Sequence, residues 1–228
     1  MESDKLIADN SKIPRTLSFK KMFLFFLIFS LIGCLYEDIY FMFKNFIRYG
    51  VFDYVTKRGL LYFELSPIYG FGACLMIYLL TRKDHKKSSY FWWGAIIGGA
   101  FEYFASLFQE FFTGTVSWNY SNYFLNIGGR TTIPYMLFWG LACYLLITKI
   151  YPYFSSKIDE IPKKVGNIIY RVLLVVISLD IFLSFTACIR FGLRHNGLAP
   201  VTWYGEFLDK YYHDERIRKS YTNMMNKE

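Results

Sequence analysis

Five long runs of apolar residues divide the chain, and most charged residues lie between the runs rather than inside them. Each run reaches the roughly 20 apolar residues that a helix needs to span a bilayer. The pattern therefore predicts an all-α fold, a polytopic membrane helix bundle with about five transmembrane helices. The expected spans are 22–43, 60–81, 90–112, 131–151 and 168–190.

The runs and the segments around them predict four parts of the chain. They are a cytoplasmic N-terminal segment at 1–21, a four-helix membrane core at 22–151, a linker with the fifth transmembrane helix at 152–192, and a tail at 193–228. In the tail, Trp203, Phe207 and Tyr211 recur at helical spacing, with charged residues between them. This spacing predicts an amphipathic helix that lies on the membrane surface.

Polar residues inside the first and third runs fall on one helical face. Gly98, Glu102 and Gln109 share a face of the third run, and Gly33 and Glu37 share the matching face of the first. Small residues on such a face let helices approach closely. Both glutamates are therefore predicted to point into the bundle.

The same two runs begin halves of similar pattern. In each half a loop follows the run, ends in an arginine beside a glycine (Arg58 and Arg130), and leads to a proline (Pro67 and Pro134) that opens the next run. A parallel helix–loop–helix repeat, related by an axis along the membrane normal, would produce this pattern. Chance similarity in a biased composition would also produce it, so both interpretations stay open.

A carboxylate in the bilayer costs several kcal/mol unless it is paired or hydrated. We expect Arg130 to pair with Glu102 and Arg58 to pair with Glu37, because arginine suits bidentate, partly desolvated pairing. Asp180 in the fifth run is a further inward-facing acid. These five residues are the candidate polar core.

Composition agrees with a membrane protein. Of 228 residues, 54% are hydrophobic and 19% charged, against about 25% charged in ordinary soluble domains. The net charge of +8 could indicate nucleic-acid binding, but the basic residues flank the apolar runs, as the positive-inside rule predicts. We therefore expect a multi-pass protein of the cell membrane with a cytoplasmic N-terminus, in contact with membrane lipid and without a nucleic-acid partner. The four cysteines lack metal-ligand spacing, so no metal or cofactor is expected.

Three functions fit the polar core. It could form a pathway for a small solute or an ion, since ionisable residues inside a membrane are functional candidates. It could belong to a membrane-embedded enzyme acting on a lipid headgroup, although no nucleophile–base pair is visible. It could also be structural, fixing helix register in an assembly protein. A homo-oligomer or another membrane subunit remains an open partner.

Seven short motifs resemble one known family. They are LYE (35–37), RG (58–59), PIYGFG (67–72), FEY (101–103), WNYS (118–121), NIGGR (126–130) and FWG (138–140). In this order, across about residues 22–150, they resemble the CmpB-like family of small bacterial membrane proteins, labelled putative type IV ABC-transporter membrane components. The transmembrane protein 229 group is similar.

The resemblance implies a permease-type component and adds candidate site residues. They are Tyr69, Trp118, Tyr120 and Asn126, beside Glu37, Arg58, Glu102 and Arg130. The sequence contains no G-x-x-x-x-G-K-[ST] phosphate loop, so this chain is not itself the ATPase of a transporter.

Overall fold

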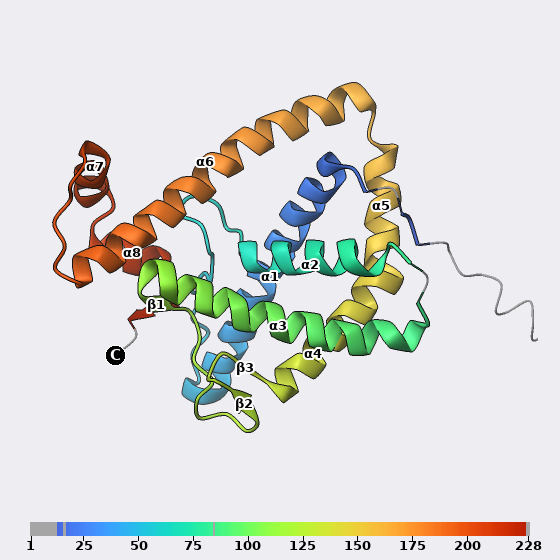
Figure 1. Ribbon diagram of the computed structural model, residues 1–228, viewed down its shortest axis with the longest axis horizontal. Coiled ribbons are helices and arrows are strands. Elements are labelled where there is room, and N and C mark those ends of the chain that lie inside the picture. The colour runs from blue at the N-terminus through green and yellow to red at the C-terminus, as the bar shows by residue number, and fades with distance from the viewer. Residues whose placement is uncertain (1–12, 16, 84, 227–228) are drawn as a thin grey trace, which may run out of the picture.

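The structure, a computed structural model, describes residues 13–15, 17–83 and 85–226, so residues 1–12 of the expected N-terminal segment lie outside it. The described chain is mostly helical, which confirms the all-α prediction (Figure 1). The helices are α1 (Phe19–Tyr49), α2 (Pro67–Leu80), α3 (Lys87–Thr113), α4 (Ile133–Leu145), η1 (Leu146–Ile150), α5 (Tyr151–Glu160), α6 (Lys163–His195), α7 (Trp203–Tyr211) and α8 (Asp214–Ser220).

The described residues include four two-residue strands, which the sequence pattern did not predict. They form two antiparallel pairs between loop segments. The strand β2 (Asn126–Ile127) pairs with β3 (Thr131–Thr132) in an antiparallel hairpin. The strand β1 (Thr115–Val116) pairs with β4 (Met225–Asn226), which joins the segment after α3 to the C-terminal end of the chain.

Three helical segments, not five, are long and apolar enough to span a membrane in the described chain: Phe19–Tyr49, Ile133–Glu160 and Lys163–His195. The helix α2 has 14 residues, which is roughly 21 Å at 1.5 Å per residue, against a hydrocarbon core of about 30 Å. The helix α3 has 27 residues, but Glu102, Gln109 and Glu110 make it more polar than the others. The prediction of five spans is therefore not confirmed.

The second predicted span begins later than expected. Residues 60–66 form a loop, and the helix begins at Pro67. The reason lies on α6, where Ser184 Oγ accepts a hydrogen bond from the Leu61 N–H (2.9 Å) and Asp180 accepts from the next two N–H groups (3.3 and 3.1 Å). These side chains replace the acceptors that a helix would supply, so the backbone donors stay satisfied.

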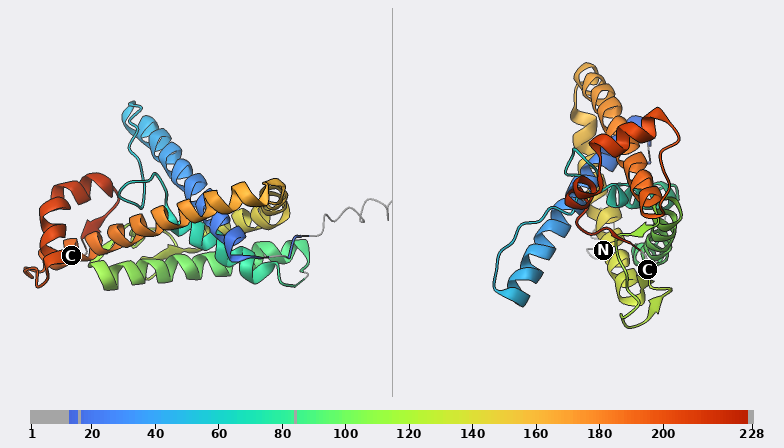
Figure 2. Two further views of the ribbon diagram at one scale, coloured as in Figure 1. Left: turned by 90° about the horizontal axis from the view of Figure 1, so that it is seen from above. Right: turned by 90° about the vertical axis from the view of Figure 1, so that its left-hand side faces the viewer.

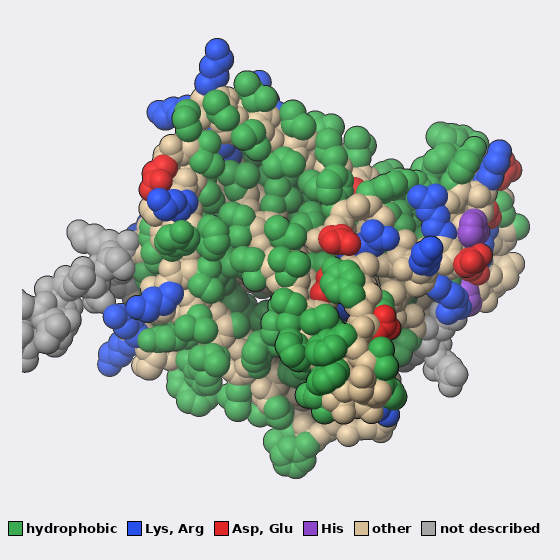
Figure 3. All heavy atoms as spheres, turned by 180° about the vertical axis from the view of Figure 1, so that it is seen from behind, with side chains coloured by type: hydrophobic (Ala, Val, Ile, Leu, Met, Phe, Trp, Pro, Cys, Tyr) green, Lys and Arg blue, Asp and Glu red, His purple; other side chains and the backbone are tan. Residues whose placement is uncertain are grey.

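The helices run between two ends of an elongated molecule (Figures 1 and 2). α1, α3 and α6 run in one general direction, and α2 and α4–α5 return. The α2–α3 link, the start of α1 and the α5–α6 junction lie toward one end, while the loops 50–66 and 114–132, α7 and α8 lie toward the other. On the face in Figure 3, charged side chains gather mainly near both ends, with mostly hydrophobic side chains between them. This distribution is typical of a protein embedded in a bilayer.

The contacts between α1 and α2 have counterparts between α3 and α4. A Cβ on Gly33 would overlap the Tyr69 side chain, and a Cβ on Gly98 would overlap that of Trp139. Glycine is therefore needed at both places for the neighbouring helix to approach.

The reverse contact is also repeated. A Cβ on Gly70 would overlap the Phe26 carbonyl oxygen, and one on Gly140 would crowd the Phe91 carbonyl oxygen. On α1 and α3, Phe91 stands 65 positions after Phe26, and Gly98 stands 65 positions after Gly33. On α2 and α4, Trp139 and Gly140 stand 70 positions after Tyr69 and Gly70. These glycine contacts therefore recur with one offset for each helix pair.

The C-terminal tail folds back onto the end of α6. Leu208, Tyr212 and Ile217 pack against Ala187 and Phe191 of α6. Thus part of the apolar face predicted to meet the membrane instead meets protein. The Trp203 side chain remains 78% exposed, so the membrane-surface role of α7 stays a prediction.

An ion-pair network holds the same junction. Arg190 makes two hydrogen bonds to Asp209 (2.7 and 2.8 Å), and Arg194 bonds both Asp209 and Asp214 at 2.7 Å. The hydrogen bond from Arg190 is the main reason that the pKa of Asp209 is lowered.

Candidate functional site

Glu102 lies in the interior and is only 7% exposed. The Tyr120 hydroxyl donates to its Oε1 (3.1 Å), and the Thr131 hydroxyl donates to its Oε2 (2.7 Å). Both donors belong to the segment between α3 and α4. That segment thus folds back over α3 and satisfies both oxygens of the carboxylate.

Glu37 has a partner of a different origin. The hydroxyl of Tyr69, on α2, donates to Glu37 Oε1 (3.0 Å). Among the described residues, neither Glu37 nor Glu102 forms an ion pair. Both acids thus have hydroxyl donors and no ion-pair partner among the described residues.

Two aromatic side chains connect these acids. The rings of Tyr69 and Trp139 lie 5.9 Å apart between centroids, and the Trp139 side chain also interacts with Glu102. Tyr69 and Trp139 are the residues that fill equivalent positions opposite Gly33 and Gly98. We call Glu37, Tyr69, Trp139 and Glu102 the acid–aromatic centre.

The predicted pair of Arg130 with Glu102 is wrong. The Arg130 guanidinium forms an ion pair with Glu110 and donates to Ser106 Oγ (3.0 Å), both on α3. The next residue, Thr131, takes the place beside Glu102. Thr131 begins β3, whereas Arg130 belongs to the turn before it, so the two side chains meet different residues of α3.

The predicted pair of Arg58 with Glu37 is also wrong. Arg58 Nε is buried and has no hydrogen-bond partner among the described residues. Asp38, which is 2% exposed, meets this loop instead: it accepts from the Lys57 N–H (2.6 Å) and the Tyr54 hydroxyl (3.0 Å). The latter bond is the main cause that raises the pKa of Tyr54 to about 12. Adjacent helical residues point about 100° apart, so Asp38 and Glu37 face different neighbours.

Trp118 and Asn126 organise the loop 114–132. Trp118 Nε1 donates to the Arg130 carbonyl (2.8 Å), while Asn126 accepts from the Gly129 N–H (3.0 Å) and donates to the Ser121 carbonyl (3.1 Å). A small pocket of about 80 Å³ lies between this loop and α3. These bonds fix the turn that places Tyr120 and Thr131 at Glu102.

Asp180 lies apart from the acid–aromatic centre, at the loop 60–63. Beside the two backbone donors described above, it accepts from the Ser184 hydroxyl (3.0 Å). Its contacts are those of a loop anchor. In the part of the chain that the structure describes, no three His, Cys, Asp or Glu side chains gather in a way that could hold a metal ion.

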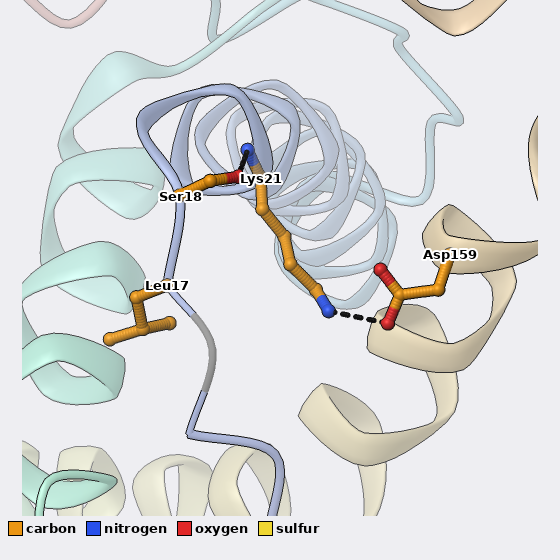
Figure 4. A pocket seen from close by; sticks show the side chains of 4 residues that line it. All are labelled: Leu17, Ser18, Lys21 and Asp159. Atoms are coloured by element: carbon orange, nitrogen blue, oxygen red, sulfur yellow. Dashed lines mark hydrogen bonds and ion pairs between the residues drawn. The ribbon is translucent and has the colours of Figure 1, made fainter. Parts of the chain in front are cut away.

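A second polar contact lies at the end of the molecule opposite to the loop 114–132 (Figure 4). Lys21 Nζ, at the start of α1, lies 2.7 Å from Asp159 Oδ2 on α5. These residues line a cavity of about 290 Å³ together with Leu17 and Ser18. The pair holds the first helix against the long α4–α5 segment.

Sequence reasoning missed four residues that the site uses: Asp38, Glu110, Thr131 and Trp139. Asp38 and Thr131 each directly follow a residue that was chosen, and Trp139 lies within the FWG motif. The position of Trp139 opposite Gly98 could have been found by matching it to Tyr69 opposite Gly33. Nothing in the sequence indicated that Glu110 rather than Glu102 would face Arg130.

Comparison with known families gives a match over most of the chain. The family described as putative ABC-transporter type IV (ABC_trans_CmpB) matches residues 24–185, which include both acids, both loops and Asp180. The chain belongs to this family, as the motifs indicated. No curated protein and no solved structure matches the chain.

Proposed function

We propose that this chain is a permease-type membrane component, and that the acid–aromatic centre lies on the path of a small solute or ion. The observation that carries the proposal is the pair of interior carboxylates, Glu37 and Glu102, that have hydroxyl partners and no ion-pair partner among the described residues. Such acids are costly inside a membrane and are kept where they bind or pass something. Family membership supports the transporter class.

The proposal includes five helices within the membrane, with α2 and α3 joining the three long segments. α2 is too short to cross alone, but the loop 58–66 before it is satisfied by protein side chains. Irregular backbone at membrane depth is tolerated where protein covers it. The constant offsets between the two helix pairs support a parallel repeat. The basic end, with Lys20, Lys83 and Lys164, would face the cytoplasm.

A structural role is the second candidate, because both oxygens of Glu102 are already hydrogen-bonded by protein. The two functions differ in water access. A path must be reachable by water-soluble reagents, whereas a structural core excludes them.

Cysteine accessibility separates these functions without knowledge of the solute. The experiment uses a chain whose four cysteines are replaced by alanine and compares Tyr36→Cys with Leu35→Cys. The native residues have nearly the same exposed fraction, 45% for Tyr36 and 46% for Leu35, but their side chains point about 100° apart. Tyr36 directly precedes Glu37 and its ring stacks on Phe138 of α4, whereas Leu35 points about 160° away from Glu37 around α1. Membrane-impermeant thiol reagents are applied to right-side-out and inside-out vesicles.

The proposal expects Tyr36→Cys to be modified in both kinds of vesicle and Leu35→Cys in neither. Modification of neither variant means that the centre is dry and structural. Equal modification of both means that this part of α1 lies outside the bilayer, which also contradicts the proposal. Labelling at Ser121→Cys from outside, without labelling at Ser88→Cys, is the expected result for a cytoplasmic N-terminus.

A further inference from the structure

Aromatic side chains of three helices lie near Glu37, among them Tyr69, which bonds it, and its neighbour Tyr36. On α1, Tyr36 stacks on Tyr40, with 6.2 Å between ring centroids, and Tyr36 also stacks on Phe138 of α4 at 5.9 Å. The Tyr69–Trp139 pair closes another side. Rings from α1, α2 and α4 thus meet around one carboxylate.

The aromatic cluster continues toward the second acid. Tyr135 of α4 lies 4.9 Å from Tyr120 between ring centroids, and Tyr120 bonds Glu102. Trp139, whose ring lies 5.9 Å from that of Tyr69 between centroids, also interacts with Glu102. These interactions place the tyrosines of both halves in one neighbourhood, so the rings form one lining rather than two separate clusters.

The negative charge of this lining is not balanced by the described protein. Lys57 interacts electrostatically with Glu37, but its ammonium group donates to Thr222 (3.2 Å) and lies 4.5 Å from the centroid of the Phe41 ring. Glu37 Oε2 accepts no hydrogen bond from the described residues, while Oε1 accepts one. The centre therefore attracts a positive charge to Glu37.

The two acids are not equally available to that charge. Glu102 is 7% exposed and both its oxygens are occupied, whereas Tyr36, Tyr40 and Phe138 beside Glu37 are each more than 40% exposed. Glu37, which is partly buried, is thus the more accessible of the two acids. Glu102 instead positions Tyr120 and the loop.

The kind of cation follows from the lining. Metal cations such as Ca²⁺ require six or more oxygen ligands, whereas an ammonium group is held by aromatic faces through their negative quadrupole, together with a carboxylate. We propose that the acid–aromatic centre binds an organic cation, with its ammonium group between the Glu37 carboxylate and the rings of Tyr36, Tyr69 and Trp139. This inference rests on the proposed function and names the substrate class of that site.

Binding of choline tests this assignment. Calorimetry on the purified full chain in maltoside detergent compares choline with 3,3-dimethyl-1-butanol, its neutral isostere, and with sodium ion. The expected result is a Kd for choline at least about tenfold lower than that for the isostere, because only choline carries the charge that the carboxylate and rings recognise. Dihexanoyl phosphatidylcholine is titrated in parallel. If this lipid binds and free choline does not, the ammonium site holds and its natural source is a lipid headgroup.

Matched variants assign the binding to these residues. Glu37→Gln keeps an acceptor for Tyr69 and is expected to raise the Kd about tenfold or more, whereas Glu64→Gln, at an exposed acid in the next loop, leaves it unchanged. Tyr36→Phe keeps the ring and is expected to keep binding, whereas Tyr36→Leu weakens it severalfold. The Tyr36 pair keeps the test decisive if Glu37→Gln fails to fold.

Two results overturn the inference. One is equal binding of choline and its isostere, and the other is binding of sodium ion without choline. In either case, modification of Tyr36→Cys from both vesicle sides would leave the proposed pathway in place with a different solute. Loss of that accessibility as well would remove the pathway itself.

Discussion

The loops that follow α1 and α3 occupy equivalent places in the two halves but are stabilised in different ways. The loop 114–132 bonds mainly to itself: the Tyr120 N–H donates to the Gly129 carbonyl (2.7 Å), and Asn126 bridges the turn. The loop 50–66 depends on side chains of other helices, Asp38 of α1 and Asp180 of α6. The loop of the second half is thus stabilised mainly by its own residues, by α3 and by β4, and the loop of the first half by acceptors on α1 and α6.

The C-terminal tail also forms hydrogen bonds with the loop 50–66. Thr222 donates to the Thr56 carbonyl (3.1 Å), and the hydroxyls of Tyr62 and Tyr212 lie 2.6 Å apart. The first loop therefore reaches its final form only when α6 and the tail are in place.

The difference extends to the acids. Glu102 receives its donors from its own loop, and Glu37 receives its donor from the following helix. The first half, tied to α6 and the tail, is where a ligand or a movement of α6 can act.

The largest expected effect is at Asp180, the residue of α6 that accepts hydrogen bonds from the loop 50–66. Asp180→Ala removes the acceptor for the Tyr62 and Phe63 N–H groups and is expected to lower the free energy of unfolding by about 3 kcal/mol, because each buried donor left unpaired costs about 1–3 kcal/mol. Thermal unfolding of the purified protein in detergent measures it. Asp53→Ala, at an exposed acid of the same loop, is the control. Equal unfolding temperatures of the two variants would mean that the loop 50–66 does not depend on Asp180.

The shared helix packing is expected to give the next largest effect. Gly33→Ala and Gly98→Ala each place a methyl group against an aromatic side chain of the neighbouring helix and are expected to destabilise by about 2 kcal/mol. Similar losses would confirm that the two halves are equivalent at this level. Leu35→Ala, on the exposed side of α1, controls for a simple change of helix composition. A loss confined to one half would break the equivalence.

The Arg130 pair supports a smaller prediction, measured as a double-mutant cycle. Glu110→Gln alone is expected to cost about 1–2 kcal/mol, because the pair is only partly buried, and adding Arg130→Met is expected to recover part of that loss. The control cycle combines Glu102→Gln with Arg130→Met and is expected to show coupling below about 0.5 kcal/mol. Strong coupling in the control cycle would restore the pairing that the sequence suggested.

The smallest expected effect concerns pH. Because Arg190 lowers the pKa of Asp209, the folded state favours the ionised carboxylate, so this stabilisation is present above the unfolded pKa of about 3.9 and is lost as pH falls through the lower folded value. Asp209 is partly exposed, so we expect less than about 1 kcal/mol. Hydrogen exchange of residues 203–220 should rise below about pH 4, before that of α3–α4. Asp209→Asn is expected to abolish this pH dependence, and its persistence would assign it to another group.

The sequence by itself determined the class of protein, the existence of the long helices and the inward polar face. These depend on local properties, namely the length of an apolar run and the helical spacing of the polar residues within it. The motifs also gave the family correctly, and residues 24–185 confirm it. Glu37 and Glu102 were predicted to face inward from helical spacing alone, and both do so with hydroxyl partners.

Only the tertiary structure decided which side chains meet. Arg130 could reach Glu102 or Glu110 along the same α3 face, and the turn at Gly128–Gly129 selected Glu110 and gave Glu102 to Thr131. The start of α2 at Pro67 depended on Asp180, which lies 113 positions further along the chain. Sequence spacing fixes the direction of a side chain within its own helix, but the partner across a loop depends on the path of the loop and on segments that pack later, so no local pattern encodes it.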